Sequence, residues 1–285
     1  MTLAGAMLAV QTRVAGALGV EMGSPLAASG ISFAVAVVAL ALLVLVRDRD
    51  AVRRLRQGPT RWWYWLGGVS GAFSATAMVV AAPRVGVAVA SVGSCTGMAL
   101  GALAADRAGF GPSGRHVLTP ARVGGSLLAV AAVAAASGSA SAGGELGLLG
   151  VLVLAGVATA FQQPVNGRLG AVSGGAFVPA LVSFSVGMAA LLVLLLVALP
   201  SVQWPTSPWL YTGGLIAAGY ITSSVLAVRR LAVLPLMLAT VGGQLTGAAL
   251  LDGLVPLEGR PLSAGAVAGA LLALSGVALA ARRPG

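Results

Sequence analysis

The chain has 285 residues, of which 58% are hydrophobic and only 8% are charged. About a quarter of the residues of a soluble domain are charged, and the mean hydropathy of +0.98 also excludes an ordinary soluble protein. The formal net charge of +10 comes from arginine alone, because all 17 basic residues are Arg.

Long apolar runs follow one another along the whole chain. A helix of about 20 apolar residues crosses the hydrocarbon core of a bilayer, and the runs are too continuous for the alternating pattern of a membrane β-barrel. The first run lacks the basic segment of a signal peptide, so we interpret it as a span. The pattern therefore predicts ten transmembrane helices, over residues 2–20, 26–46, 62–82, 85–105, 121–138, 146–164, 176–199, 209–228, 231–251 and 262–281.

The arginines gather in alternate loops between the predicted helices. Positive residues in short loops mark the cytoplasmic side of a membrane. The opposite loops hold only Arg84 and Arg260. We therefore expect a multi-pass membrane protein with both termini in the cytoplasm, and the basic balance indicates no binding of nucleic acid. The arginines on the predicted cytoplasmic side are Arg47, Arg49, Arg53, Arg54, Arg56, Arg61, Arg107, Arg115, Arg122, Arg168, Arg229, Arg230, Arg282 and Arg283.

The two halves of the chain resemble one another when one is shifted onto the other. The shift is 151 residues near the start of each half (162 − 11) and 146 residues after the Arg-rich loop (252 − 106). The aligned pairs are VQTRVAGALG (10–19) with FQQPVNGRLG (161–170), ISF (31–33) with VSF (182–184), WYWLGG (63–68) with WLYTGG (209–214), and Asp106 with Asp252.

Each repeat, 1–140 and 141–285, holds five of the predicted helices. Because five is an odd number, the second repeat enters the membrane with the opposite orientation, and the positions of the arginines indicate the same. Inverted repeats are typical of secondary transporters, whose substrate site lies near the membrane midplane between the repeats. The sequence thus predicts an all-α membrane transporter that works by alternating access.

Several motifs of the second half resemble one family. They are Gln162, Asn166, Arg168, Leu169 and Gly170, VSFSVG (182–187), the Trp and paired Gly of 209–214, GQLTG (243–247), Asp252 and GRPLS (259–263). This set resembles the YdcZ-like inner-membrane exporter branch of the drug/metabolite transporter (DMT) superfamily. The first half resembles a degenerate copy, with Ala15 where the family has Asn and Met98 where the second half has Gln244.

The resemblance implies a fused pair of five-span units with the DMT, EamA-like fold. It also implies export of small metabolites or drugs through a cavity lined by the first four helices of each repeat. No cofactor is expected. A fused pair should form a whole pore as a monomer, although a dimer is compatible with the sequence. The family does not define a substrate.

Polar side chains inside predicted helices are the candidates for substrate binding, because an unpartnered polar group in hydrocarbon is costly. Each has an alternative role as a hydrogen-bonding contact between helices, and we expect that role for Asn166 in particular. The candidates are Gln11, Arg13, Gln162, Gln163, Asn166, Tyr220, Gln244 and Thr246.

Arg13 is the arginine predicted to lie within a span. An intramembrane arginine is rare, and its guanidinium could bind a carboxylate or phosphate through two hydrogen bonds. The alternative is that its long side chain reaches the outer surface of the bilayer. If Arg13 binds substrate, the substrate is expected to be a small anion. If Arg13 reaches the surface instead, a small neutral substrate is expected.

The acidic residues all fall in loops or at helix ends, and we expect Asp106 and Asp252 to be solvated there. The sequence therefore offers no mid-membrane carboxylate for proton coupling. With one histidine, His116, and one cysteine, Cys95, it shows no metal, nucleophile or phosphate-loop motif, so we predict no enzyme and no disulfide. Two other functions stay open, a flippase for a lipid-linked carrier and a membrane scaffold or receptor that transports nothing.

Overall fold

A computed structural model describes residues 2–110, 114–115, 119–137, 144–231, 233–254 and 264–280. Within these ranges every regular element is helical. The elements are α1 (Thr2–Glu21), α2 (Pro25–Arg47), α3 (Arg49–Gln57), the 3-10 turn η1 (Trp62–Leu66), α4 (Gly67–Val85), α5 (Val87–Ala108), α6 (Pro120–Ser137), α7 (Gly144–Ser173), α8 (Phe177–Ala198), η2 (Pro208–Thr212), α9 (Gly213–Val228), α10 (Val233–Leu254) and α11 (Ala264–Ala280).

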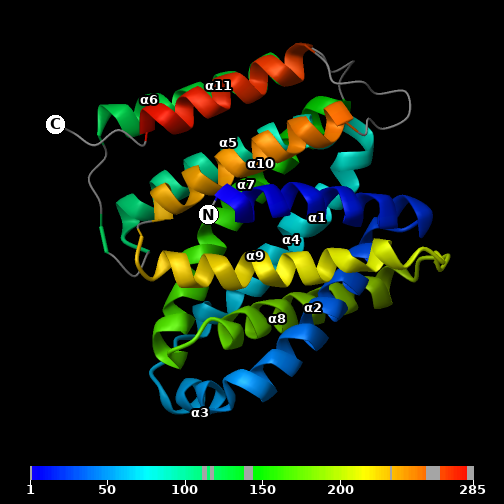
Figure 1. Cartoon of the computed structure of the whole chain (residues 1–285), viewed down its shortest axis with the longest axis vertical. Coiled ribbons are helices and arrows are strands. Elements are labelled where there is room, and N and C mark those ends of the chain that lie inside the picture. The colour runs from blue at the N-terminus through cyan, green and yellow to red at the C-terminus, as the bar shows by residue number, and fades with distance from the viewer. Residues whose placement is uncertain are drawn as a thin grey trace.

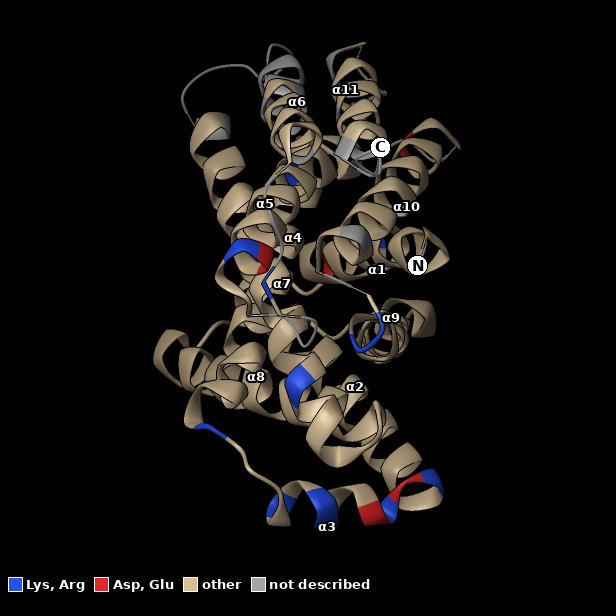
Figure 2. Ribbon diagram, turned by 90° about the vertical axis from the view of Figure 1, so that its left-hand side faces the viewer, with Lys and Arg blue, Asp and Glu red and all other residues tan. Residues whose placement is uncertain are grey.

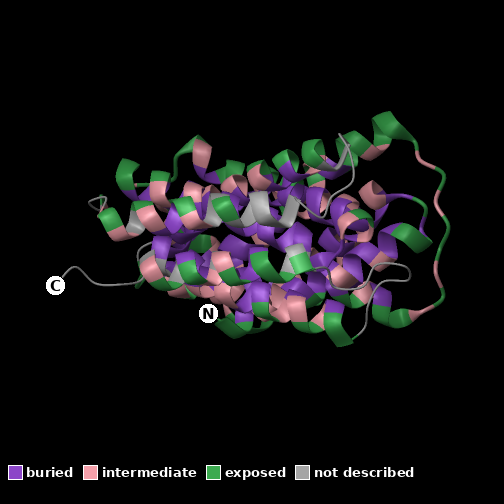
Figure 3. Ribbon diagram, turned by 90° about the horizontal axis from the view of Figure 1, so that it is seen from above, coloured by how far each residue is buried: buried purple, intermediate pink, exposed green. Residues whose placement is uncertain are grey.

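The outer surface of the bundle is apolar. Large side chains such as Leu42 and Val46 on α2, and Leu196 and Val197 on α8, point outward, and Figure 3 shows the exposed residues around a buried interior. Within the described ranges, seven helical segments are long and apolar enough to cross a membrane: Thr2–Glu21, Pro25–Arg47, Trp62–Val85, Val89–Ala108, Leu146–Ser173, Phe177–Ala198 and Pro208–Val228. The chain is therefore an all-helical integral membrane protein.

The long helices lie side by side, and many neighbours come from opposite halves of the chain (Figure 1). Helix α1 packs against α10, α5 against α7, and α2 against α8, while α6 and α11 lie together along one edge. The two halves of the chain are thus interleaved.

Contacts between the halves occur in related pairs. Two residues are called counterparts here when the sequence shift relates them, by 151 positions in α1 and α2 or by 146 positions in α4 and α5. Gly97 of α5 lies against the backbone of Val153 in α7, and their counterparts, Gly243 of α10 and Thr2 of α1, make the same contact. A side chain at either glycine would overlap the carbonyl oxygen of the facing helix, so these crossings require glycine.

Among the described helices, α7 departs most from its predicted ends. The sequence predicts a span that stops at residue 164, but α7 continues through Pro164 to Ser173. Proline removes one backbone hydrogen bond from a helix interior. Here Val165 and Leu169 are buried beyond it, and this packing stabilises the extra turns.

Helix α3 lies where the sequence analysis placed only a loop. Ala51 and Leu55, one turn apart, are buried, while the arginines between them face outward. Arg54 Nε donates to the carbonyl oxygen of Ser173 at 2.6 Å, which ties α3 to the end of α7. Figure 2 looks onto this end of the bundle, where α3 carries several arginines. We call it the α3 end.

The opposite end of the bundle, called the distal end here, is joined by different contacts. The backbone N–H of Gln203, in the segment after α8, donates to the carbonyl oxygen of Met22 after α1 at 3.2 Å. Helices α1 and α4 therefore run toward the distal end, whereas α7 and α9 run toward the α3 end. Counterpart helices therefore run in opposite directions, α1 opposite to α7 and α4 opposite to α9.

Candidate functional site

A cavity of about 70 Å³ lies near the middle of the helices, between the two halves of the chain. A water molecule needs about 10–15 Å³ by this measure, so the cavity has room for several. Its walls come from α1, α2, α4 and α5 of the first half and from α7, α8, α9 and α10 of the second. These are the helices for which the family resemblance predicts a cavity. None of the described residues that line it is charged.

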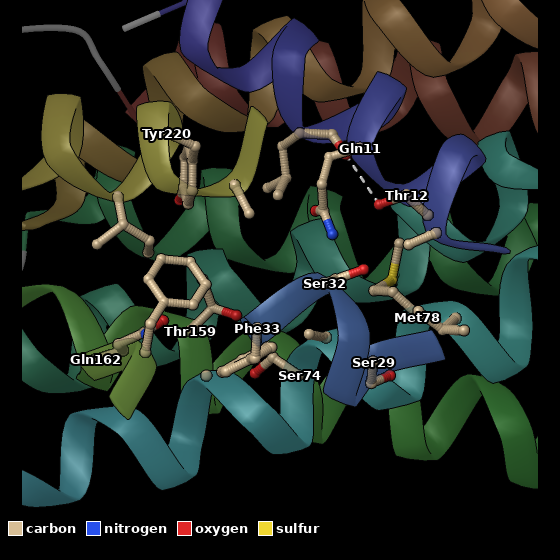
Figure 4. A pocket seen from close by; sticks show the side chains of 18 of the residues that line it. Gln11, Thr12, Ser29, Ser32, Phe33, Ser74, Met78, Thr159, Gln162 and Tyr220 are labelled. Atoms are coloured by element: carbon tan, nitrogen blue, oxygen red, sulfur yellow. Dashed lines mark hydrogen bonds between the residues drawn. The ribbon is translucent and has the colours of Figure 1, made fainter. Parts of the chain in front are cut away.

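Three glutamines reach the cavity from three helices. Gln162 Nε2 donates to Ser183 Oγ at 3.0 Å, and Gln244 Nε2 donates to Ser91 Oγ at 3.4 Å. The amide of Gln11 makes no hydrogen bond with the described residues and extends into the cavity (Figure 4). Gln11 and Gln162 are counterparts, so the repeat alignment predicted that they would face a common space.

Two buried amides, those of Gln163 and Asn166, contact hydroxyl groups of Tyr220 and Ser183, which line the cavity. Gln163 Nε2 donates to the hydroxyl oxygen of Tyr220 at 3.3 Å. Asn166 Nδ2 lies 3.5 Å from Ser183 Oγ, which is a long hydrogen bond. Gln163 and Asn166 are completely buried and do not belong to the cavity wall. The structure therefore separates them from Gln11, Gln162, Gln244 and Tyr220.

Two aromatic rings contact each other in the wall of the cavity. Phe33 and Phe184 are counterparts, and their ring centroids lie 5.0 Å apart in an edge-to-face arrangement. Both rings line the cavity, so hydrogen-bonding groups and an aromatic surface face the same space. A site of this composition suits a small molecule with both polar and apolar parts.

Arg13 and Thr246 lie outside the cavity. Arg13 Nη1 is 3.3 Å from Asp252 Oδ1, and Arg13 lines a separate hollow of about 190 Å³ toward the distal end together with Glu21. Thr246 is exposed on α10, and its hydroxyl donates to the carbonyl oxygen of Gly242. The charge of Arg13 is thus compensated within the protein.

The two aspartates expected to be solvated helix ends are buried instead, and that expectation was wrong. Asp106 accepts hydrogen bonds from the backbone N–H groups of Val233 and Leu234, both at 3.1 Å, at the start of α10. Asp252 lies beside Gly86, where α5 begins. A carboxylate at a helix N-terminus satisfies free N–H groups and interacts favourably with the helix dipole.

The sequence analysis did not single out most of the hydroxyl groups in the cavity wall. These residues are Thr12, Ser29, Ser32, Ser74 and Thr159. Serine and threonine are common throughout the chain, so composition alone gives no signal. The repeat alignment did contain one, because Ser32 and Phe33 in ISF match Ser183 and Phe184 in VSF.

The fold and the cavity define a helical membrane protein with a space between its two halves that is lined by polar and apolar side chains. The sequence profile of the family described as "Putative inner membrane exporter, YdcZ" matches residues 1–135 and 147–279. The chain belongs to this family, which is a family of exporters and not of enzymes.

A second comparison concerns the fold alone. A solved structure described only as "Crystal structure of protein" superposes with a TM-score of 0.66 at 19% sequence identity, and covers 98% of this chain and 96% of that one. No curated protein matches the sequence.

Proposed function

We propose that the chain is a secondary transporter that exports a small, uncharged, hydrogen-bonding organic molecule by alternating access. The observation that carries this proposal is the central cavity, which is lined by amides, hydroxyls, aromatic rings and aliphatic side chains, and by no charged described residue. A charged substrate there would be desolvated without a partner, which costs several kcal/mol or more. Of the neutral and anionic substrates considered from the sequence, the neutral one fits better because Arg13 is paired with Asp252.

The proposed architecture is ten spans in two inverted repeats, 1–140 and 141–285, with both termini in the cytoplasm. The two matched segments of the family profile and the related contacts of Gly97 and Gly243 support the repeats. The arginines at the α3 end support the orientation. Since both halves line the cavity, one chain is expected to suffice, with substrate and lipid as its partners.

The cavity also bears on the two other functions. A flippase would need a polar groove that opens sideways to the lipid, whereas here the polar groups lie centrally, among eight helices of both halves. A scaffold would need no polar interior, and burying amides in a membrane without a function is unfavourable. The polar cavity therefore favours transport of a small molecule over both.

The test is a ligand screen on the purified chain in nanodiscs, followed by efflux from proteoliposomes. Matched uncharged, anionic and cationic metabolites are compared by the shift they cause in thermal unfolding. We expect uncharged compounds to stabilise the protein, and Gln11→Leu to weaken the best ligand about tenfold by removing one hydrogen bond. Gln203→Leu, in an exposed segment, is the matched control. Stabilisation by anions alone would contradict the proposal.

A further inference from the structure

The cavity is displaced toward the distal end. Thr12 and Ala15 of α1 and Met78 of α4 line it, and each lies nearer the distal end than Gln11 or Ser74 on the same helix. Figure 4 shows Thr12, Ser29 and Met78 together on one side of the cavity, with Gln162 and Tyr220 on the other.

The counterparts of these residues do not line the cavity. Thr12, Ala15, Ser29, Met78 and Val79 correspond by the shifts of 151 and 146 to Gln163, Asn166, Ala180, Ser224 and Val225. All five counterparts have 0% exposure, and all lie on the α3 side of the cavity. The helices of the two halves are related, but the residues that line the cavity are not. This asymmetry corresponds to a structure that is closed at the α3 end.

Three of the five buried counterparts carry polar atoms that make no hydrogen bond of good geometry with the described residues. The atoms are Gln163 Oε1, Asn166 Oδ1 and Ser224 Oγ, the last of which lies near the hydroxyl of Tyr220. Exchanging the oxygen and nitrogen of either amide would leave an amino group unpaired in place of the oxygen. An unpaired buried polar group costs about 1–3 kcal/mol, so such groups require an explanation. Their apolar counterparts, Ala15 and Met78, carry no such cost.

The geometry points to a second substrate site at the α3 end, formed by Gln163, Asn166 and Ser224 when the two halves exchange conformations. In that state the distal side packs as the α3 side does here, and the three polar groups line the cavity. Their free acceptors take N–H or O–H donors from an uncharged molecule, or from water. This inference rests on the proposed transport function. It adds the position at which the substrate binds before export.

Contacts at the α3 end hold this second site closed. Arg54 bonds the carbonyl oxygen of Ser173 at 2.6 Å, and Arg229 Nη1 bonds that of Gly174 at 3.4 Å. Both carbonyls lie at the end of α7, the helix that carries Gln163 and Asn166. Opening the site requires these contacts to break, so weakening them should favour the open state.

Cysteine labelling tests this without any substrate. In a Cys95→Ala background, Ser224→Cys is compared with its counterpart Met78→Cys, using a membrane-impermeant maleimide on oriented membrane vesicles. We expect Met78→Cys to react from the distal face and Ser224→Cys to react only from the α3 face. Adding Arg54→Gln should raise the labelling rate of Ser224→Cys severalfold and lower that of Met78→Cys.

A second pair, Asn166→Cys with Ala15→Cys, guards against a variant that fails to fold, and size-exclusion profiles identify the folded samples. The inference is overturned if Ser224→Cys and Asn166→Cys in folded protein react from neither face, or from the distal face. It is also overturned if Met78→Cys never reacts, because the exchange needs both states. Failure of the ligand screen with successful labelling would instead contradict only the proposed transport of uncharged compounds.

Discussion

Arg13 and Asp252 form an ion pair that joins the first and second halves of the chain, with Arg13 Nη1 and Asp252 Oδ1 3.3 Å apart. The pair lies toward the distal end, where α10 finishes beside the start of α5. It has no counterpart at the α3 end, because position 164, which corresponds to Arg13, is proline. There Asp106 caps the start of α10.

Removing one member of this pair should destabilise the protein without affecting the cavity. Arg13→Gln removes the guanidinium that pairs with the mostly buried carboxylate of Asp252, so we expect a loss of about 3 kcal/mol in the free energy of unfolding. The double variant Arg13→Gln/Asp252→Asn should recover part of it. Thermal unfolding in detergent and ligand affinity measure the two effects. A hundredfold loss of affinity in folded Arg13→Gln would show that Arg13 binds substrate after all.

Asp106 should stabilise the start of α10. Asp106→Ala leaves the backbone N–H groups of Val233 and Leu234 unsatisfied, at about 1–3 kcal/mol for each buried donor. We expect a lower unfolding temperature and faster hydrogen exchange in the first turn of α10. Asp106→Asn keeps an oxygen acceptor and should be milder. Equal behaviour of the two variants would indicate that the negative charge is the essential feature.

The glycine crossings allow a controlled comparison on two helices. Gly97→Ala would place a methyl group against the backbone of Val153, and we expect it to cost about 1–3 kcal/mol through overpacking. Gly150 of α7 has open space around its Cβ position. Gly150→Ala should therefore leave the unfolding temperature unchanged or raise it. Similar losses in both variants would mean that helix flexibility, rather than close packing, explains the glycines.

The proposed orientation can be checked at two exposed positions. Gln57 lies at the end of α3, and Ser201 lies in the segment between α8 and η2. In the Cys95→Ala background, Gln57→Cys should react with an impermeant maleimide only from the cytoplasmic side, and Ser201→Cys only from outside. The reverse labelling pattern would contradict the assignment of the α3 end to the cytoplasm.

The sequence predicted best what depends on periodicity and repetition. Apolar runs identified the long helices, and the alignment of Gln11 with Gln162 identified two residues that line one cavity. The signal for α3 was present as Ala51 and Leu55, four residues apart, but the surrounding arginines obscured it. Loop and short helix are difficult to distinguish when so few residues are apolar.

Contacts between distant parts of the chain could not be predicted. Arg13 and Asp252 are separated by 239 positions, and Asp106 and Val233 by 127. Their charges therefore looked isolated in the sequence, whereas in the structure each carboxylate lies at the start of a helix from the other half. Gln163 and Thr246 looked similar as intramembrane polar residues, yet one is completely buried and the other exposed. Only the packing of the helices distinguishes them.

Helix α3 occurs in the first half of the chain and not in the corresponding described segment of the second half. The two halves can differ in this way because they are parts of one fused chain. Two identical five-span subunits would carry any such helix at both faces, and the two open states would then have equal energies. Here Arg54 of α3 bonds the carbonyl oxygen of Ser173 at the end of α7, and this contact stabilises packing at the α3 end alone. A difference of about 1.4 kcal/mol between the two states corresponds to a tenfold ratio of their populations. An insertion of a few residues can therefore determine which end of the empty transporter is open. It thereby determines the side of the membrane from which the transporter takes up its substrate.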